Sequence, residues 1–174
     1  IYTLRSDGTT ISIDTYRGEN TYISIPNEID GYAVVEIGDY AFAEKEIKSI
    51  EIPSGVTVIG CNAFSGCTNL RDIKIPDSVS EIYDFAFSNC PSLKYLKLPS
   101  SLNYLGEGVF AGSLINLSGG NSQFNTRASY GLLLTGNNRE LIYNSGNDFY
   151  IPNHREIQVI RSHAFEKPSQ SNLN

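Results

Sequence analysis

A 23-residue repeat constrains what this chain can fold into more than any other feature of its sequence. Proline follows an aliphatic residue at regular steps, and the step from Pro53 to Pro76 is as long as the step from Pro76 to Pro99. A phenylalanine follows each of these prolines at the same distance, at Phe64, Phe87 and Phe110. Periods of roughly 20 to 50 residues are typical of solenoids, in which each repeat buries its apolar edge against the next. We therefore expect stacked coils.

The residues between successive prolines predict one short strand and one small helical turn in every coil. Ile73-Lys74-Ile75 alternates apolar and polar side chains, as a strand with one buried face does. The proline after it ends the strand, because proline has no N–H for the ladder. Asp39, Asp84 and Ser162 each stand two residues before an Ala-Phe pair, and these residue types commonly cap the start of a helix.

The register of the repeat predicts two buried columns of stacked side chains. One column consists of Ile50, Ile73 and Leu96, and the other of Phe42, Phe64, Phe87, Phe110 and Phe165. The pattern is imperfect at both ends. About five extra residues surround Asp30-Gly31, and after Phe110 the polar Asn116 and Gly119 stand where the repeat predicts apolar residues. It resumes at Ile151-Pro152.

The segments outside the regular coils suggest how the chain is organised. We expect one domain over residues 1–174, beginning with an N-terminal hairpin segment (1–25) that turns at Asp7-Gly8. The repeat coils follow at 26–117. Residues 118–148 are expected to form a linker and a hairpin insert, with strands at 132–134 and 141–143, and residues 149–174 a further coil and a tail.

The composition excludes several broad classes of protein. Hydrophobic residues make up 40% of the chain, whereas intrinsic disorder requires low hydrophobicity together with high net charge. Apolar stretches such as residues 131–134 are far shorter than the roughly 18 residues of a membrane span. The formal net charge of −6 argues against a nucleic-acid partner, which normally requires a basic surface.

The three cysteines fit packing better than they fit a metal or redox site. Cys61, Cys67 and Cys90 include no Cys-x-x-Cys pair, so they predict neither a zinc site nor a disulfide framework. Cys67 and Cys90 occupy the same place in adjacent coils, and we favour buried free thiols there. A disulfide is the alternative, because neighbouring strands lie roughly 4.8 Å apart. Cys61 stands in the capping position and is expected to be more exposed.

Written out, the repeat reads Ile-Pro-x2-Val-x2-Ile-Gly-x2-Ala-Phe-x2-Cys-x2-Leu-x2-Ile-x-Ile, and it matches residues 23–117 and 149–165 well. This unit resembles the BspA-like class of leucine-rich repeats of bacterial surface proteins. The resemblance implies a leucine-rich-repeat solenoid of the α/β superhelix class, rich in β-structure, with short parallel strands. It also implies export to the cell surface or beyond and adhesion to host matrix proteins or other cells. It carries no catalytic residues to this chain.

Basic residues gather at the exposed strand positions of three consecutive coils. Five of the 13 basic residues of this acidic chain fall there, accompanied by one tyrosine: Lys48, Arg71, Lys74, Lys94 and Lys97, with Tyr95. One interpretation is a solvated face that Glu51 and Asp72 partly neutralise. The functional hypothesis is a cationic binding patch for an acidic protein surface or an anionic glycan.

No group of residues predicts catalysis, a metal or a cofactor. Gly106-Glu107-Gly108 imitates a phosphate-binding loop, but Gly106 is the glycine of the repeat and no full helix is expected after it. The two histidines, His154 and His163, fit surface positions better than a metal site or a catalytic triad.

We therefore expect a non-catalytic binding or adhesion module displayed outside a bacterial cell. Its expected partner is a host matrix or cell-surface protein, or an anionic glycan. The alternatives are a structural spacer within a larger surface protein and the substrate-binding appendage of a glycan-processing enzyme.

Overall fold

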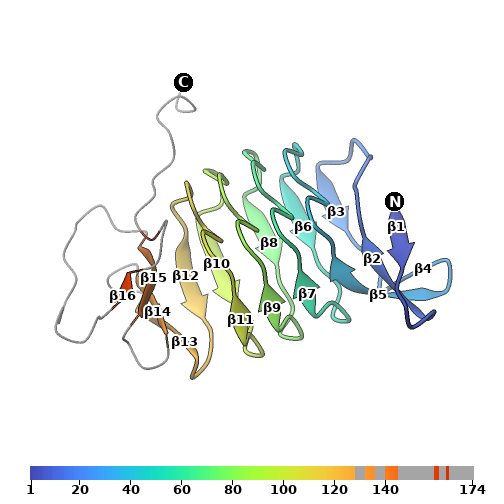
Figure 1. The fold of residues 1–174 in the computed structure, drawn as a ribbon. Helices are drawn as coiled ribbons and strands as arrows, with labels where there is room; N and C mark the ends of the chain where they lie inside the picture. The colour runs from blue at the N-terminus through green and yellow to red at the C-terminus, as the bar shows by residue number, and fades with distance from the viewer. Residues whose placement is uncertain (128–131, 136–139, 145–158, 161–163, 165–174) are drawn as a thin grey trace.

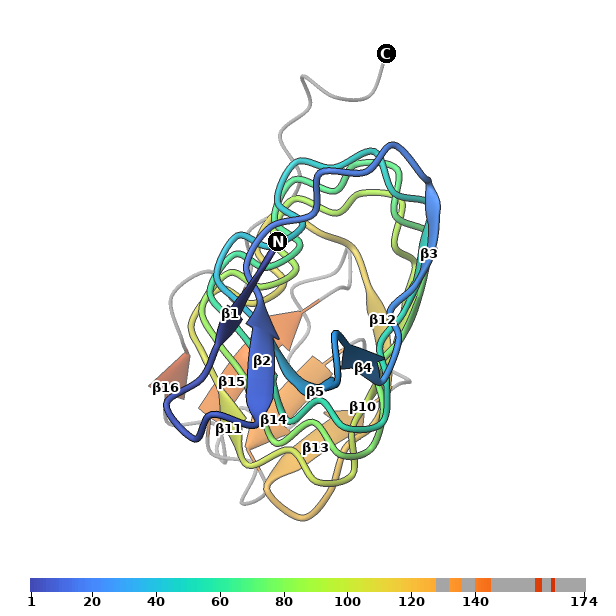
Figure 2. The same cartoon turned by 90° about the vertical axis from the view of Figure 1, so that its right-hand side faces the viewer.

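The chain folds into a solenoid of stacked coils. The computed structural model describes residues 1–127, 132–135, 140–144, 159–160 and 164. Figure 1 shows the coils side by side from the N-terminal end onward, and Figure 2, viewed along the stack, shows that they superpose. This confirms the stacked coils that the regular step of the repeat predicts, and it confirms the leucine-rich-repeat solenoid that the family resemblance implies.

Strands from successive coils form two faces of the solenoid. The strands of the first face are β1 (Tyr2–Leu4), β2 (Thr10–Ile13), β5 (Tyr32–Ile37), β7 (Val58–Ile59), β9 (Glu81–Ile82) and β11 (Tyr104–Leu105), with β4 (Glu28–Ile29) on β5. The second face consists of β3 (Tyr22–Ser24), β6 (Ser49–Glu51) and β8 (Asp72–Lys74), followed by β10 (Tyr95–Leu98) and β12 (Asn116–Gly119). Strands of successive coils pair in parallel on both faces.

A column of aromatic rings fills the interior between the two faces. Phe42, Phe64, Phe87 and Phe110 are buried, and the centroids of successive rings lie 5.3, 5.3 and 6.2 Å apart. The predicted column is therefore confirmed for these four residues, and Phe165 lies outside the described residues. Tyr16 stacks on Phe42 at 5.4 Å, and its hydroxyl contacts the backbone of Asn20, so the column ends on a polar group.

The aliphatic column runs along the inner side of the second face. Ile50 aligns with Ile73 in the β6–β8 pair, and Leu96 aligns with Leu117 in the β10–β12 pair. All four side chains are buried. The pattern does not fail after Phe110 but shortens, because Leu117 follows Leu96 two positions sooner than the regular step predicts. An alignment with a fixed step places Asn116 and Gly119 in the apolar positions by mistake.

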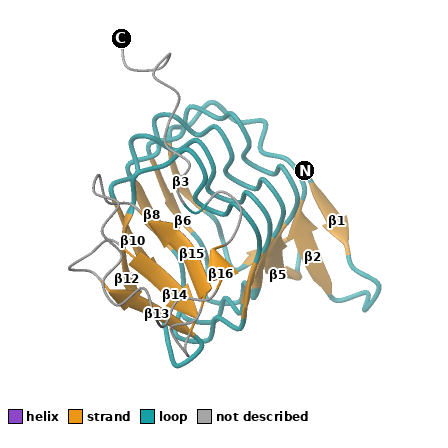
Figure 3. Cartoon of the chain, turned by 60° about the vertical axis from the view of Figure 1, so that its left-hand side comes forward, coloured by secondary structure: helices purple, strands orange, loops and turns teal. Residues whose placement is uncertain are grey.

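The predicted helical turns are wrong. No helix occurs among the described residues, as Figure 3 shows. One equivalent residue in each of four coils has a left-handed backbone that an α-helix does not allow, with φ between 54° and 58° at Tyr40, Asn62, Phe85 and Gly108. Alternate backbone N–H groups of these turns instead bond to the next coil, as from Phe42 to the Ala63 carbonyl at 2.8 Å.

The aspartates expected to cap helices instead link one coil to the next. The Asp39 carboxylate accepts a hydrogen bond from the N–H of Cys61 at 2.7 Å, and that of Asp84 accepts one from the N–H of Glu107 at 2.8 Å. At this position of the coil, an aspartate in one coil is therefore followed in the next coil by the residue whose N–H it binds. This explains why the same position holds Cys61 and Glu107, which are poor helix caps.

Two hairpins close the N-terminal end. Strands β1 and β2 pair antiparallel around the predicted turn, where the Asp7 carboxylate accepts hydrogen bonds from Thr9 and Thr10. These bonds lower the pKa of Asp7 to about 2. The extra residues after Pro26 form a second hairpin, β4–β5. Its turn residues Asp30 and Gly31 both have positive φ (53° and 83°), which a two-residue type I′ turn requires.

The C-terminal strands form a separate four-stranded sheet of β13 (Phe124–Arg127), β14 (Leu132–Thr135), β15 (Glu140–Asn144) and β16 (Val159–Ile160). β14 and β15 are the predicted hairpin. β13 lies in the stretch expected to be a linker, which also contains the end of β12. Local pattern indicates β13 only weakly, because its sole apolar residue is Phe124. The single domain over 1–174, with its boundaries, stays a prediction.

The cysteine column consists of free thiols. Cys67 and Cys90 are buried and unbridged, and each Sγ donates to a phenylalanine carbonyl of a neighbouring coil: Phe42 at 3.0 Å and Phe64 at 3.2 Å. Ser113 takes the same place in the next coil, and its hydroxyl donates to the Phe87 carbonyl at 2.9 Å. The column is therefore a set of small hydrogen-bond donors between coils.

We expect a thiol reagent to modify one cysteine of the folded protein. Burial raises the pKa of Cys67 to about 11 and raises that of Cys90 further, so their thiolates are scarce and inaccessible. Cys61 is half-buried, and burial followed by the charge of Asp39 raises its pKa more modestly. Mass spectrometry after iodoacetamide treatment should show slow labelling at Cys61 that accelerates with pH, and labelling of all three after unfolding. Rapid native labelling at Cys67 or Cys90 would contradict this arrangement.

Candidate binding surface

The outward side of β3, β6, β8, β10 and β12, here called the strand face, presents two columns of exposed or half-exposed positions. Side chains alternate along a strand, so every second residue points away from the core. The first column is Tyr22, Ser49, Asp72, Tyr95 and Asn116, and the second is Ser24, Glu51, Lys74, Lys97 and Ser118.

All six residues of the predicted patch are exposed on or beside the strand face. Lys74, Tyr95 and Lys97 belong to the two columns, whereas Lys48, Arg71 and Lys94 directly precede the strands. The backbone brings the last group together coil by coil. The N–H of Arg71 donates to the carbonyl of Lys48 at 2.9 Å, for example.

Acidic neighbours neutralise part of this patch. The Lys74 ammonium lies 3.2 Å from Oε1 of Glu51, and that of Lys97 lies 3.5 Å from Oδ2 of Asp77. A hydrogen bond from the N–H of Ser100, followed by the charge of Lys97, lowers the pKa of Asp77. Such exposed pairs contribute little to stability, so they do not prevent these lysines from binding a partner.

The remaining three cations are held without a carboxylate in the described part of the chain. Lys94 Nζ donates to the carbonyl of Pro91 at 2.7 Å, and Lys48 Nζ lies 5.9 Å from the ring centroid of Tyr22. Arg71 has no ion pair among residues 1–127. The edge defined by Lys48, Arg71 and Lys94 is therefore the least neutralised part of the patch.

Tyr22 belongs to this surface, although the register of the repeat does not predict it. Its side chain is 70% exposed, and Tyr95 in the same column is 74% exposed, so the two rings are the most exposed large apolar side chains of the described chain. Tyr22 precedes the first regular coil, which is why the register of the repeat did not include it. The alternation of Tyr22, Ile23 and Ser24 is the sequence signal that indicates an outward position for Tyr22.

A shallow hollow lies between these features. It has a volume of about 290 Å³ and is lined by Tyr22, Ser49, Glu51, Asp72 and Lys74 among others. A second hollow of about 450 Å³ shares Ser24, Glu51 and Lys74 with it and extends toward Pro53 and Pro76. Aromatic, hydroxyl and charged groups thus surround a depression that can receive a ligand.

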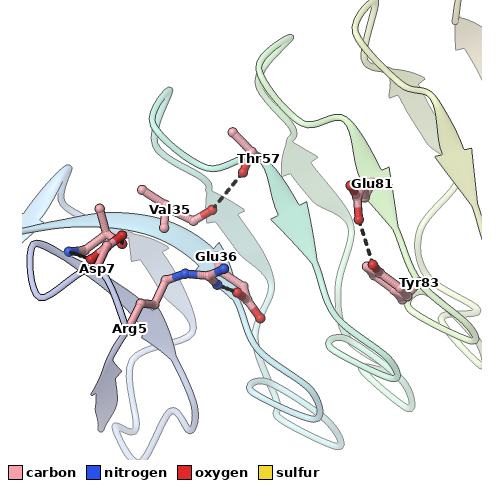
Figure 4. A network of polar contacts seen from close by, with 8 residues as sticks. Arg5, Asp7, Val35, Glu36, Thr57, Glu81 and Tyr83 are labelled. Atoms are coloured by element: carbon pink, nitrogen blue, oxygen red, sulfur yellow. Dashed lines mark hydrogen bonds and ion pairs between the residues drawn. The ribbon is translucent and has the colours of Figure 1, made fainter.

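The opposite face holds its polar groups in internal pairs, as Figure 4 shows. Arg5 forms an ion pair with Glu36, and the Tyr83 hydroxyl donates to Glu81 at 2.7 Å. The hydrogen bond to Glu81 raises the pKa of Tyr83.

The remaining site candidates from the sequence either have a structural role or lie outside the described residues. Gly106 packs against Asp84, and Gly108 lies under the ring of Phe85, so the glycine-rich segment serves the stacking of coils. His154 and His163 lie outside the described residues. Within the described ranges, no three His, Cys, Asp or Glu residues gather as metal ligands, and no helix could span a membrane.

The family model of the BspA type leucine rich repeat region matches residues 35–132 in six copies. Curated protein sequences show no match to the chain. A leucine-rich repeat protein of T. pallidum of known structure is 30% identical, with a TM-score of 0.56 over 65% of this chain and 67% of its own. One from Bacteroides capillosus is 28% identical, with a TM-score of 0.59 over 68% and 93% of the two chains.

The pneumococcal vaccine antigen PcpA shares the fold over a longer stretch. It is 20% identical, with a TM-score of 0.70, and the alignment covers 92% of this chain and 57% of PcpA. The repeat register, the parallel strands of successive coils and the six matched copies agree. The chain belongs to the BspA-type leucine-rich repeat family.

Proposed function

We propose that this chain is a non-catalytic binding module that recognises an acidic protein surface through its strand face. The observation that carries the proposal is the placement of Tyr22 and Tyr95, which stand 70% and 74% exposed on the same face as the cations. Exposed tyrosine and arginine side chains are typical of interface hot spots. Display at or beyond a bacterial cell surface, as in the family that the repeat resembles, is part of the proposal.

The charges give the proposed interaction its selectivity. The chain as a whole carries a formal charge of −6, so its net charge repels an acidic partner, whereas Lys48, Arg71 and Lys94 attract one locally. An acidic surface is therefore steered toward this edge, where the tyrosines supply contact area. Screening over about 8–10 Å at ordinary ionic strength weakens this attraction as salt rises.

We expect the double substitution Arg71→Ala/Lys94→Ala to weaken binding by about tenfold or more, because it removes two cations from the edge. The measurement is surface plasmon resonance against purified acidic extracellular-matrix proteins, with heparin as the anionic-glycan probe, at two salt concentrations. Arg17→Ala/Lys45→Ala makes the same change in net charge at residues that belong neither to the two columns nor to the edge of Lys48, Arg71 and Lys94, and it is the control. Tyr95→Ala tests the aromatic contribution.

The outcomes separate the proposal from its alternatives. Binding that ignores salt and the double substitution would reject the strand face as the site. Binding to heparin but to no protein would assign the face to an anionic glycan. An absence of any ligand would favour the spacer.

A further inference from the structure

Three cations beside the strand face stand at equivalent places in successive coils. Lys48, Arg71 and Lys94 each lie two residues before the buried aliphatic residue of the strand that follows. The backbone links the first two directly, since the N–H of Arg71 donates to the carbonyl of Lys48 at 2.9 Å. Figure 1 shows the strands that follow them, β6, β8 and β10, side by side along the stack. The cations therefore form a row parallel to the axis of the solenoid, with one charge for every coil.

The spacing of this row follows from the packing of the core. The coils that carry the three cations are those of Phe42, Phe64 and Phe87, whose ring centroids lie 5.3 Å apart at both steps. Paired strands of a sheet lie about 4.8 Å apart. A ligand that contacts all three cations in the same way must therefore present one anion about every 5 Å along the stack.

An α-helix that lies along the stack meets this requirement. One helical turn rises about 5.4 Å, so residues at i, i+4 and i+7, which share one side of the helix, depart from the three coils by about 1 Å at most. An extended segment places the side chains of one side about 6.7 Å apart, so its third anion would lie about 3–4 Å beyond the third coil. The row of cations therefore favours a helix over an extended segment.

The width of the strand face agrees with the same ligand. The chain takes three strand steps from Lys48 to Glu51, which is about 10 Å. A helix with its side chains is about 10–12 Å wide. A helix along the stack therefore covers the edge and the two columns at once, whereas a helix parallel to the strands spans about two coils and misses one of the three cations.

We propose that the acidic partner of the strand face docks with an α-helix that lies along the stack and carries acidic residues at i, i+4 and i+7 toward Lys48, Arg71 and Lys94. This proposal rests on the proposed function, because it uses the same cations, and it adds the shape and direction of the docking element. Charge complementarity selects the acidic side of the helix. The agreement between one helical turn and one coil selects its direction.

The column beside the edge limits how far the acidic side of the helix extends. Ser49, Asp72 and Tyr95 lie in this column, and Asp72 is exposed. A second carboxylate above Asp72 would be repelled, whereas an apolar side chain above Tyr95 would cover a ring that is 74% exposed. The helix that fits is therefore amphipathic, with one acidic row toward the edge and neutral or apolar residues above the column.

Two synthetic peptides of identical composition test this arrangement. Each has about 20 residues, mostly alanine and glutamine for helicity in water, and three glutamates. The row peptide has its glutamates at i, i+4 and i+7, and the scattered peptide has them at every sixth residue, which turns them to three sides of the helix. With capped ends and equal helicity by circular dichroism, both would be titrated to about 1 mM against the whole chain at low salt, with isotope-labelled amides observed by NMR.

We expect the row peptide to bind at least about fivefold more tightly than the scattered peptide, because two more of its carboxylates reach a cation. The amide shifts should centre on Lys48, Arg71 and Lys94. Arg71→Ala/Lys94→Ala should remove the difference between the peptides, whereas Arg17→Ala/Lys45→Ala should keep it. In a double-mutant cycle, Arg71→Ala should couple more strongly to the loss of the middle glutamate than to the loss of either outer one.

Three results would overturn the proposal, and each is distinct from a failure of the proposed function. Equal binding of both peptides, weakened in both cases by Arg71→Ala/Lys94→Ala, would keep the edge as the site and reject the helix. Undiminished binding of a row peptide with a central proline, which breaks the helix, would assign the edge to an extended segment. An absence of shifts with either peptide would also reject the helix, whereas the proposed function fails only if binding to acidic proteins ignores the double substitution.

Discussion

Replacing Phe87 with alanine should lower the free energy of unfolding by about 3–5 kcal/mol, the usual cost of truncating a buried phenylalanine. Phe87 is fully buried and stacks between Phe64 at 5.3 Å and Phe110 at 6.2 Å. Its loss leaves a cavity in the middle of the column, where neighbours on both sides are fixed by their own coils. Urea unfolding followed by circular dichroism gives the change.

Tyr95→Ala is the control for this measurement. That side chain is 74% exposed, so its removal should change stability by no more than about 0.5 kcal/mol. A loss below about 1 kcal/mol for Phe87→Ala would mean that the column is not tightly packed. A double substitution with Phe64→Ala should depart from additivity, because the two rings are in direct contact.

The aromatic column also shows why so much of the fold could be predicted. Phe64, Phe87 and Phe110 recur at equal intervals because each coil has to place the same side chain above the last. Equal spacing in the sequence therefore predicts which side chains stack. Where the coil length changes, a fixed spacing predicts the wrong residue, as it does at Leu117, which lies at the end of a shorter coil.

The turns differ from the predicted helical turns because the hydrogen bonds that stabilise them join neighbouring coils. Asp84 precedes an Ala-Phe pair as a helix cap would, but the N–H that it binds belongs to Glu107 in the next coil. The left-handed residue Phe85 follows at once, with φ of 57°. Phenylalanine seldom adopts this conformation, so local propensity gave no warning of it.

The candidate site was predictable only in part. The alternation of the strands places Lys74, Tyr95 and Lys97 on one surface, and the sequence contains that information. The ion pair of Lys97 with Asp77 joins a strand to the loop after a different strand, which periodicity alone does not specify. Tyr22 precedes the first regular coil, so the register of the repeat does not predict its place on this surface.

A relation between aspartate and glycine in neighbouring coils follows from the same contacts. A Cβ atom at Gly60 would lie 2.5 Å from Oδ1 of Asp39, and one at Gly106 would lie 2.3 Å from Oδ1 of Asp84. In the pair of coils between these two, Cys61 stands in place of the aspartate and Tyr83 stands in place of the glycine. The two pairs of coils that an aspartate carboxylate joins are therefore also the pairs in which a glycine packs against that aspartate.

Gly106→Ala should consequently destabilise the protein by about 1–3 kcal/mol, the range found for overpacked sites, despite the small size of the added methyl group. The methyl group would meet not only the carboxylate of Asp84 but also its backbone nitrogen at 2.6 Å, so the two coils have to separate. Gly55→Ala is the matched control, because its only close neighbour is the Val34 carbonyl at 3.1 Å. Adding Asp84→Ala to Gly106→Ala removes the carboxylate clash and leaves the backbone clash, so the double variant should lose less than the sum of the single losses. Equal stability of Gly106→Ala and Gly55→Ala in urea unfolding would show that the coils do not need this close approach.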